Sequence, residues 1–423
     1  MECVTTAITP PVIFLRLDYN MGISTNRIAP LGVRPHAVKT AVSLIISSII
    51  YDNSDNNHKE CNMPEKIFIS ELTVENFRSI RKMEARNFGQ INIITGNNNA
   101  GKTAFLEALF LNLGPTNPTL WTRINAIRGL DRISPSQSTA PYLFNEMNMT
   151  TSILFSVKTK EGNIKNLSIR YYEPETSEFN GLSKDNEEGV SSETVMISDV
   201  EESKIVELAY ESGHDAPRIT RSIISPNRIQ LQGDKTQVYY ESVFISPDIK
   251  SDKDIDAKRY DLLNRENRIA EFECLLKVIE PDLLRTSLGI ENEQTIIHAD
   301  TGFGLMPLSL LGSGSLRLSK ILLALVYSKG GVVLIDEVEN SFHHSILPKV
   351  WSGIAEFIRG DDCQVFATTH SRECIEAAIS VFEQNKSIDF RVHRIDKTGQ
   401  ISKLYTFDLE QIKVALETGW EMR

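Results

Sequence analysis

The sequence predicts an α/β fold in which a mixed sheet carries a glycine-rich loop, and three observations support this. A strand-like segment, "QINIITG", precedes a glycine-rich loop and an apolar helix, "KTAFLEALFLNL". Helical and strand-like segments alternate from residue 305 onward. Two alternating strands flank "KEGN" between residues 151 and 172. Strand–helix alternation is typical of parallel sheets and hairpins of antiparallel ones, so we expect a mixed sheet, an antiparallel β subdomain and a small helical lobe.

The elements can be placed in chain order from their periodicity and their turn residues. Beyond the segments above, we expect a strand at 67–74, a helical stretch near 119–132, a mobile acidic loop at 173–193, strands within 203–210 and 236–246, helical character over 254–289 interrupted by Pro281, helices at 315–328, 344–358 and 371–383, strands at 331–335 and 363–368, a hairpin around "DKTGQ" and a short helix near 408–418.

Residues 1–62 differ from the rest of the chain. They contain four prolines, no sustained period and the polar run "DNSDNNHKE". We interpret them as a disordered or poorly packed leader, although an arm that contacts a partner is the alternative. The remainder, 63–423, is expected to form one domain. Its three parts are a lobe at 63–250 with the glycine-rich loop and antiparallel strands, a helical lobe at 251–330, and a final part at 331–423.

Composition limits the classes of function. The net charge of −11 argues against nonspecific binding to nucleic acid or anionic membranes, but it leaves a local basic patch open. The five cysteines form no C-x-x-C pair, which predicts neither a disulfide framework nor a zinc site and fits a reducing cytoplasm. The apolar run at 41–50 is shorter than the roughly 20 residues that a membrane helix needs. We therefore expect a cytoplasmic protein without a membrane partner.

The glycine-rich loop carries the strongest motif in the chain. Residues 96–103, "GNNNAGKT", match G-x-x-x-x-G-K-[ST] between a strand and a helix. Backbone N–H groups of such a loop turn inward at phosphate oxygens, the lysine reaches the β- and γ-phosphates, and the next hydroxyl ligates Mg²⁺. This predicts nucleotide binding rather than a chance glycine loop. The residues expected at the nucleotide are Gly96, Asn97, Asn98, Asn99, Ala100, Gly101, Lys102 and Thr103, and Thr103 is also expected on the metal.

A carboxylate pair follows a buried strand in "GGVVLIDEVENSFHH", residues 330–344. The strand delivers Asp336 and Glu337 at its carboxyl end, where ligands of open α/β sheets collect. Asp336 suits Mg²⁺ coordination, directly or through its outer shell. Glu337 can orient and deprotonate an attacking water, which predicts hydrolysis. An ordinary solvated acidic turn is the alternative, and the phosphate loop makes it the weaker one.

A third strand, "CQVFATTHS" at 363–371, ends in two threonines and His370. A histidine at the end of a neighbouring parallel strand can hydrogen-bond the γ-phosphate or the catalytic water. We therefore place His370 with Glu337 among the catalytic candidates, in preference to a merely satisfied polar residue.

These motifs, in this order, resemble those of ABC-type ATPase heads of the SMC, RecF and OLD superfamily. "LTVENFRSI" (72–80) is similar to the opening strand of RecF-like heads, and "MPLSLLGSGSLRLSKILLAL" (306–325) to the signature segment. The chain most resembles the compact AAA15 ATPases, which are RloA-like and OLD-like. The resemblance implies a RecF/SMC-like P-loop NTPase head, with ATP and Mg²⁺ as its ligands.

In this superfamily two heads enclose two nucleotides, so the resemblance implies a homodimer. It places Ser313, Gly314 and Ser315 of one head on the γ-phosphate held by the other. "ENSFHHS" falls where the D-loop crosses the dimer interface, so Asn340, Ser341 and His343 are interface candidates. The Q-loop has only an approximate position, at 142–149.

Two functions remain in competition at this stage. The first is an ATP-binding and hydrolysing switch that controls a separate, nuclease-like effector in anti-phage defence or DNA metabolism. The second is a RecF-like repair or recombination ATPase that binds DNA directly, which the arginines within 77–86 and 121–132 support only weakly. A transporter ATPase lacks the expected signature string, and a GTPase lacks N-K-x-D. The trigger, the effector and any assembly beyond a dimer cannot be read from the sequence.

Overall fold

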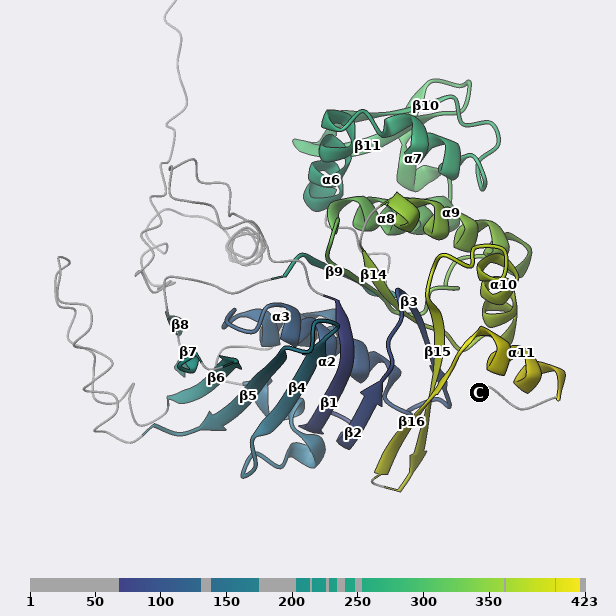
Figure 1. Ribbon diagram of the computed structural model, residues 1–423. Coiled ribbons are helices and arrows are strands. Elements are labelled where there is room, and N and C mark those ends of the chain that lie inside the picture. Colours follow the sequence, from purple (N-terminus) through teal and green to yellow (C-terminus); the bar gives the residue numbers. More distant parts are fainter. Residues whose placement is uncertain are drawn as a thin grey trace, which may run out of the picture.

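The computed structural model describes residues 68–130, 138–174, 203–213, 215–225, 228–233, 240–247, 253–360, 363–399 and 401–418. The leader expected at 1–62, and nearly all of the loop expected at 173–193, lie outside these residues. Within them, two large sheets and a smaller third one are stacked with helices (Figure 1).

A six-stranded mixed sheet organises the fold. Its order is β16-β15-β3-β14-β13-β9, and all neighbours are parallel except β15 and β16. The three central strands therefore end at the same edge. Their bounds and those of their neighbours are β3 (Ile91–Gly96), β9 (Ser242–Ile245), β13 (Val332–Ile335), β14 (Gln364–Thr368), β15 (Phe390–Thr398) and β16 (Ile401–Phe407). The predicted mixed sheet is confirmed.

The central strands are buried and mostly apolar because both faces of the sheet are covered. In β13, Val333 and Ile335 point into one core and Val332 and Leu334 into the other. The first core lies under α8 (Ser313–Tyr327), α9 (Leu347–Gly360) and α10 (Arg372–Phe382). The second lies around α2 (Lys102–Leu113). This arrangement places α2 directly after β3, as a phosphate loop requires.

An antiparallel sheet of seven strands packs against α2 and α3 (Leu120–Ile127) on the second core (Figure 1). The predicted hairpin at 151–172 is confirmed as β4 and β5. The strand β2 was not foreseen, since its arginines and lysine belong to a run that resembled a solvated basic face. Ile80, Met83 and Ala85 are its buried residues. The strands are β1 (Ile69–Phe77), β2 (Ile80–Arg86), β4 (Ile153–Thr159), β5 (Ile164–Tyr172), β6 (Lys204–Ser212), β7 (Arg218–Ser225) and β8 (Arg228–Gly233).

A side-chain amide joins the two large sheets. Gln364, at the start of β14, is fully buried. Its Oε1 accepts the backbone N–H of Ile69 in β1 at 2.9 Å, and its Nε2 donates to the carbonyls of Ile69 and Gly89, each at 2.8 Å. One glutamine thus supplies the hydrogen bonds that a paired strand would have supplied at this junction.

The lobe that precedes α8 contains α6 (Lys253–Arg265), α7 (Ile269–Leu276) and a three-stranded antiparallel sheet (Figure 1). The expectation of helix up to residue 289 is wrong, since β10 begins at Arg285. Asn292 and Glu293 both adopt positive φ, +48° and +65°, and so close a tight hairpin between β10 and β11. The strands of this sheet are β10 (Arg285–Glu291), β11 (Gln294–Asp300) and β12 (Leu305–Pro307).

The expected alternation after residue 305 is confirmed to within a few residues. The helix expected from 344 starts at Leu347, after a single 3₁₀ turn at His344–Ile346. The final helix, α11 (Leu409–Glu417), begins with a capping box between Asp408 and Gln411. Across the described part of the chain, no helix has both the length and the apolarity needed to cross a membrane.

Candidate functional site

The loop between β3 and α2 is wound too tightly for most side chains at its glycines. Gly96 has φ +138°, and a Cβ there would lie 2.3 Å from the carbonyl oxygen of Ile395. Gly101 has φ +105° and takes the N-cap position of α2. Because glycine has no side chain to cap the helix, the first backbone N–H groups of α2 remain available to an anion.

Lys102 folds back onto this loop. The residue is 5% exposed, and its Nζ donates to the carbonyl oxygens of Gly96 at 2.7 Å and Asn97 at 2.9 Å. Burial lowers the pKa of Lys102, while the carboxylates of Asp336 and Glu337 oppose that shift. The ammonium group therefore lies at the loop with donors committed to neutral acceptors, and an anionic ligand would be a stronger partner.

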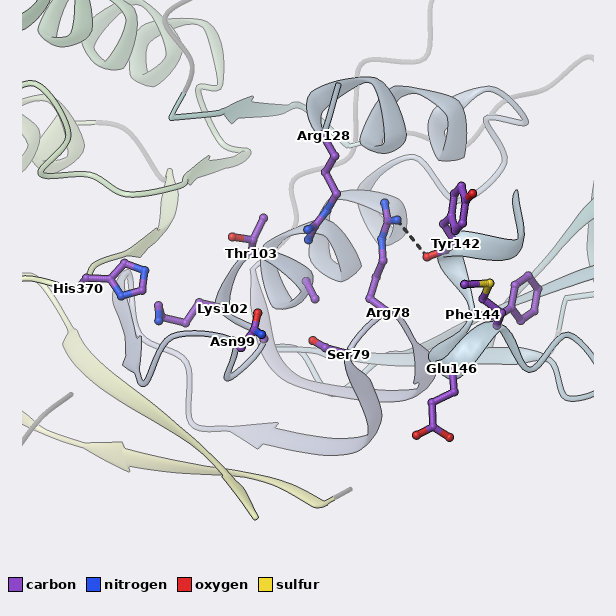
Figure 2. A pocket seen from close by; sticks show the side chains of 13 residues that line it. Arg78, Ser79, Asn99, Lys102, Thr103, Arg128, Tyr142, Phe144, Glu146 and His370 are labelled. Atoms are coloured by element: carbon purple, nitrogen blue, oxygen red, sulfur yellow. Dashed lines mark hydrogen bonds between the residues drawn. The ribbon is translucent and has the colours of Figure 1, made fainter. Parts of the chain in front are cut away.

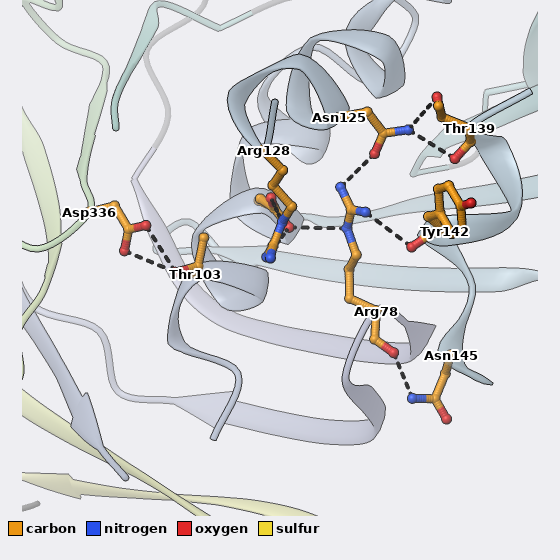
Figure 3. A network of polar contacts seen from close by, with 9 residues as sticks. Arg78, Thr103, Asn125, Arg128, Thr139, Tyr142, Asn145 and Asp336 are labelled. Carbon is orange, nitrogen blue, oxygen red and sulfur yellow. Dashed lines mark hydrogen bonds and ion pairs between the residues drawn. The ribbon is translucent and has the colours of Figure 1, made fainter. Parts of the chain in front are cut away.

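Asp336 lies at the end of β13 and is 3% exposed. Its carboxylate accepts the Thr103 hydroxyl at 2.9 and 3.2 Å and the Thr368 hydroxyl at 2.6 Å. These contacts join the ends of three elements that are far apart in sequence, namely α2, β13 and β14. Figure 3 shows the first pair.

The donor set at Asp336 fits a hard cation, because the Thr103 hydroxyl and the carboxylate both offer oxygen. In the part of the chain that the structure describes, no group of three or more His, Cys, Asp or Glu side chains could hold a metal ion. A Mg²⁺ ion here would be completed by phosphate oxygens and water, which is the usual arrangement for this cation.

Glu337 and His370 face each other at the edge of the sheet. The His370 Nε2 and Glu337 Oε1 atoms are 3.9 Å apart, and the two side chains are 38% and 43% exposed. Glu337 has φ +50°, and its backbone N–H is held by the Thr368 hydroxyl at 2.8 Å. A left-handed conformation is strained for glutamate, so the surrounding contacts must fix it.

A cavity of about 450 Å³ opens beside the loop. Lys102, Thr103 and His370 lie on one side of it and Tyr142, Phe144 and Glu146 on the other (Figure 2). The second side belongs to the segment 142–149, where the sequence only approximately located a Q-loop. The structure therefore brings this segment next to the phosphate loop.

Two arginines that line the cavity are paired with a buried carboxylate on α2. Glu107 is fully buried and accepts Arg78 Nε at 3.2 Å and Arg128 Nε at 2.6 Å. Arg78 also donates to the Asn125 side chain at 2.7 Å and to the Tyr142 carbonyl at 3.0 Å (Figure 3). Burial lowers the pKa of Arg78, and the Glu107 charge opposes that shift. These arginines of the two basic runs are thus engaged within the chain.

The signature segment lies at the start of α8, and its three candidates differ in exposure. Ser313 is exposed and Gly314 is half-buried. Ser315 is 1% exposed, and its hydroxyl donates to Glu280 Oε1 at 2.5 Å. A Cβ on Gly314 would lie 3.1 Å from the carbonyl oxygen of Ser341, so glycine allows this close approach. None of the three lines the cavity of the same chain, and their trans contact remains a prediction.

Sequence reasoning did not find Arg317, whose guanidinium binds the backbone of the segment that carries Asp336 and Glu337. The residue is 1% exposed and donates to the carbonyls of Ser246, Asp336 (2.7 Å) and Glu337 (3.3 Å). Burial lowers its pKa to about 10, opposed by the nearby carboxylates. The sequence signal that could have identified Arg317 is its charge within the largely apolar helical segment 316–325.

Comparison with known proteins gives a family and several relatives. Residues 91–376 match the family model described as "AAA domain, putative AbiEii toxin, Type IV TA system". An ATP/GTP phosphatase of Helicobacter pylori is 26% identical over 348 residues, covering 75% of this chain and 89% of the relative.

Among solved structures, the chain is similar to an SMC head bound to the C-winged helix domain of ScpA. The TM-score is 0.44 at 13% identity, covering 82% of this chain and 99% of the other. An SMC head from Pyrococcus furiosus with an extended coiled coil, bound to the C-terminal domain of ScpA, gives a TM-score of 0.41 at 13% identity, covering 84% and 100%.

Proposed function

The chain belongs to the AbiEii-type family of AAA ATPase domains, and from that premise we propose that it is a switch driven by ATP binding and hydrolysis. The observation that supports this most is the common edge of β3, β14 and β13. There the phosphate-loop residue Thr103 is hydrogen-bonded to Asp336, and Glu337 faces His370 across 3.9 Å.

The proposed reaction is attack of water on the γ-phosphate, which breaks the β–γ phosphoanhydride bond and releases ADP and phosphate. Lys102 transfers its donors from the loop carbonyls to the β- and γ-phosphate oxygens, which are charged and therefore better acceptors. Glu337 takes the proton of the attacking water, and His370 hydrogen-bonds the γ-phosphate or that water. Thr103 and Asp336 would hold a Mg²⁺ ion, which would supply positive charge next to the phosphates.

The nucleotide is ATP in this proposal, and GTP is a second substrate to test because of the relative's name. We place Ser313 on the γ-phosphate of a second copy, since it is the exposed serine of the signature segment, while Ser315 is committed to Glu280. Ser315 then supports the segment from within its own head.

The partner in this proposal is a separate, nuclease-like effector in the cytoplasm, controlled by a homodimer that closes around nucleotide. The family's description, which names a toxin of a toxin–antitoxin system, supports a role in defence. The AAA15-like, OLD-like subgroup belongs to the same proposal. Direct DNA binding is the weaker alternative, because Arg78 and Arg128 are paired with Glu107.

Glu337→Gln tests this function. The amide keeps the size of the side chain but cannot accept the proton, so we expect phosphate release to fall about 10²- to 10⁴-fold while ATP still binds. Initial rates with Mg²⁺–ATP and equilibrium binding of labelled ATP measure the two effects, and size exclusion with ATP tests for a trapped dimer. Glu376→Gln, an exposed carboxylate on α10 paired with Arg372, is the control and should hydrolyse normally. Normal hydrolysis by Glu337→Gln would reject the assigned base.

A further inference from the structure

We propose that Glu339 is a positioning residue of this site, whose carboxylate holds the backbone of His370 and thereby sets the distance between His370 and Glu337. The inference deepens the proposed function and rests on it. Glu339 Oε1 accepts the backbone N–H of His370 at 2.7 Å. Neither the family's description nor the sequence motifs assign a role to this residue.

The contact occurs where the backbone hydrogen bonds between β14 and its neighbour β3 end. The backbone N–H of Thr369 still donates to the carbonyl of Ile94 in β3, at 3.0 Å. The next N–H, that of His370, donates instead to the Glu339 side chain. The carboxylate thus continues the hydrogen bonding by one residue, and that residue carries the imidazole which faces the cavity.

Glu339 can hold the His370 N–H because backbone hydrogen bonds fix the turn on which Glu339 lies. Val338 donates to the carbonyl of Thr368 at 3.0 Å, and Asn340 and Phe342 donate to the carbonyls of Glu337 (2.9 Å) and Glu339 (3.0 Å). The segment 337–342 therefore forms one hydrogen-bonded unit against the end of β14. Glu337 and Glu339 are both part of it, so a fixed link from Glu339 to His370 also fixes the pair His370–Glu337.

The second carboxylate oxygen of Glu339 lacks the support that the first one has. Glu339 Oε2 is buried, and among the described residues it has no hydrogen-bond partner. Burial of a carboxylate oxygen without a donor is unfavourable, so this side of the Glu339 carboxylate is incomplete, whereas the Lys102 ammonium is hydrogen-bonded to loop carbonyls. Burial lowers the pKa values of Lys102 and Arg317, and Glu339 opposes that shift together with Asp336 and Glu337.

The same unit extends into the segment that the sequence assigned to the dimer interface. Ser341 adopts φ +70°, and its carbonyl oxygen lies against Gly314 of the signature segment. A second copy that contacts residues 340–343 would therefore press on the turn that bears Glu339. Closing of two heads would thus act on the His370 imidazole through a short path, since residue 343 is only four positions from Glu339 in the sequence.

A double-mutant cycle between Glu339 and His370 tests the inference. We expect Glu339→Ala to lower kcat for ATP about 10- to 100-fold with KM changed less than about threefold. In a His370→Ala background the same substitution should lower kcat less than about twofold, because there is no imidazole left to position. Steady-state phosphate release measures all four proteins, and Glu376→Ala on α10 is the surface control.

Two conservative variants separate the hydrogen bond from the charge. Glu339→Gln keeps an oxygen that accepts the His370 N–H, so it should retain at least about a third of the rate. Glu339→Asp keeps the charge but is one methylene too short to reach, so it should behave like Glu339→Ala. Circular dichroism and thermal unfolding establish that each variant is folded.

The outcomes divide cleanly. Additive losses in the cycle, or a Glu339→Asp variant more active than Glu339→Gln, would overturn the positioning role. If Glu339→Ala does not fold, the comparison of Gln with Asp decides the question alone. A wild-type chain that hydrolyses no nucleotide would instead reject the proposed function, and an active wild type with an additive cycle would reject only this inference.

Discussion

The buried polar groups at the two ends of the central strands differ in whether they are hydrogen-bonded. At the amino ends, Asn92, Gln364 and His393 are fully buried, and the side chain of each is hydrogen-bonded at both of its polar atoms. At the carboxyl ends, Arg317 Nε and Glu339 Oε2 are buried without a partner among the described residues. These three amino-end side chains are thus fully hydrogen-bonded, whereas two groups at the carboxyl end lack a partner within the described part of the chain.

The difference identifies which end is structural. A buried polar network stabilises a fold only when every member is satisfied, and an unsatisfied member costs free energy. The amino-end network meets that condition without any ligand. The carboxyl-end groups do not, which is typical of a site whose ligand supplies the missing partners. Variants at the two ends should therefore affect different measurements.

The largest expected effect comes from the carboxyl end. Lys102→Ala removes the cation that pairs with the phosphates, so ATP affinity should fall at least about 100-fold, equivalent to about 2.7 kcal/mol. The free energy of unfolding without nucleotide should change by about 1 kcal/mol or less, since Asn97 is exposed and its released carbonyl can bind water. Calorimetric titration and chemical denaturation measure the two quantities. Retained affinity would contradict the phosphate-loop assignment.

Gln364→Ala tests the amino end. The substitution removes the amide from the backbone N–H and carbonyl of Ile69, whereas the Gly89 carbonyl keeps its hydrogen bond from Asn92 at 2.9 Å, so unfolding should become easier by about 2.5 kcal/mol. ATP affinity should stay within about twofold of wild type. Urea unfolding provides the comparison, with the exposed Gln294→Ala on β11 as a control expected within about 0.5 kcal/mol. Equal stability of the two variants would show that the amide does not join the sheets.

The smallest effect concerns pH. Burial lowers the pKa of His393 to about 3, with Arg391 acting in the same direction. Between about pH 6.5 and 3 the unfolded chain binds a proton that the folded chain does not, so stability from this group falls as the pH falls. From pH 7 to 5 the loss is about 2 kcal/mol.

His393→Gln should remove that contribution and flatten this part of the acid limb. Denaturant unfolding at pH 7 and pH 5 checks it, and the wild type must lose more stability than the variant over that interval. Parallel curves would show that His393 does not titrate in this range. Any loss of folding stability between pH 7 and pH 5 would then have to come from another titratable group.

Local pattern predicted the architecture where period and turn residues agree. The phosphate loop, the "VVLI" strand and the "QVFATTH" strand lie where the sequence placed them, and parallel pairing brings Thr103 to Asp336. Residues 285–291 were misjudged because a short apolar-polar segment after a helix fits either period. Only the hairpin turn at Asn292 and Glu293 decides for a strand.

The contacts that surround the candidate site were not predictable in the same way. Glu107 meets Arg78 and Arg128, which lie 29 and 21 residues away in sequence. Arg317 reaches Asp336 across 19 residues. No spacing rule connects such pairs, because their proximity results from the packing of helices on the sheet. The motifs therefore predict candidate residues for the chemistry, whereas the residues that hold these candidates in place emerge only from the three-dimensional arrangement.

The amide of Gln364 also has a mechanical consequence. A strand rises about 3.3 Å per residue, so the four steps from Gln364 to Thr368 span about 13 Å. One end of β14 is fastened to β1 in the antiparallel layer, and the other carries the hydroxyl that Asp336 accepts. No loop lies between them to absorb a tilt. A tilt of the antiparallel layer would therefore be transmitted along β14 to the Thr368 hydroxyl and so to Asp336.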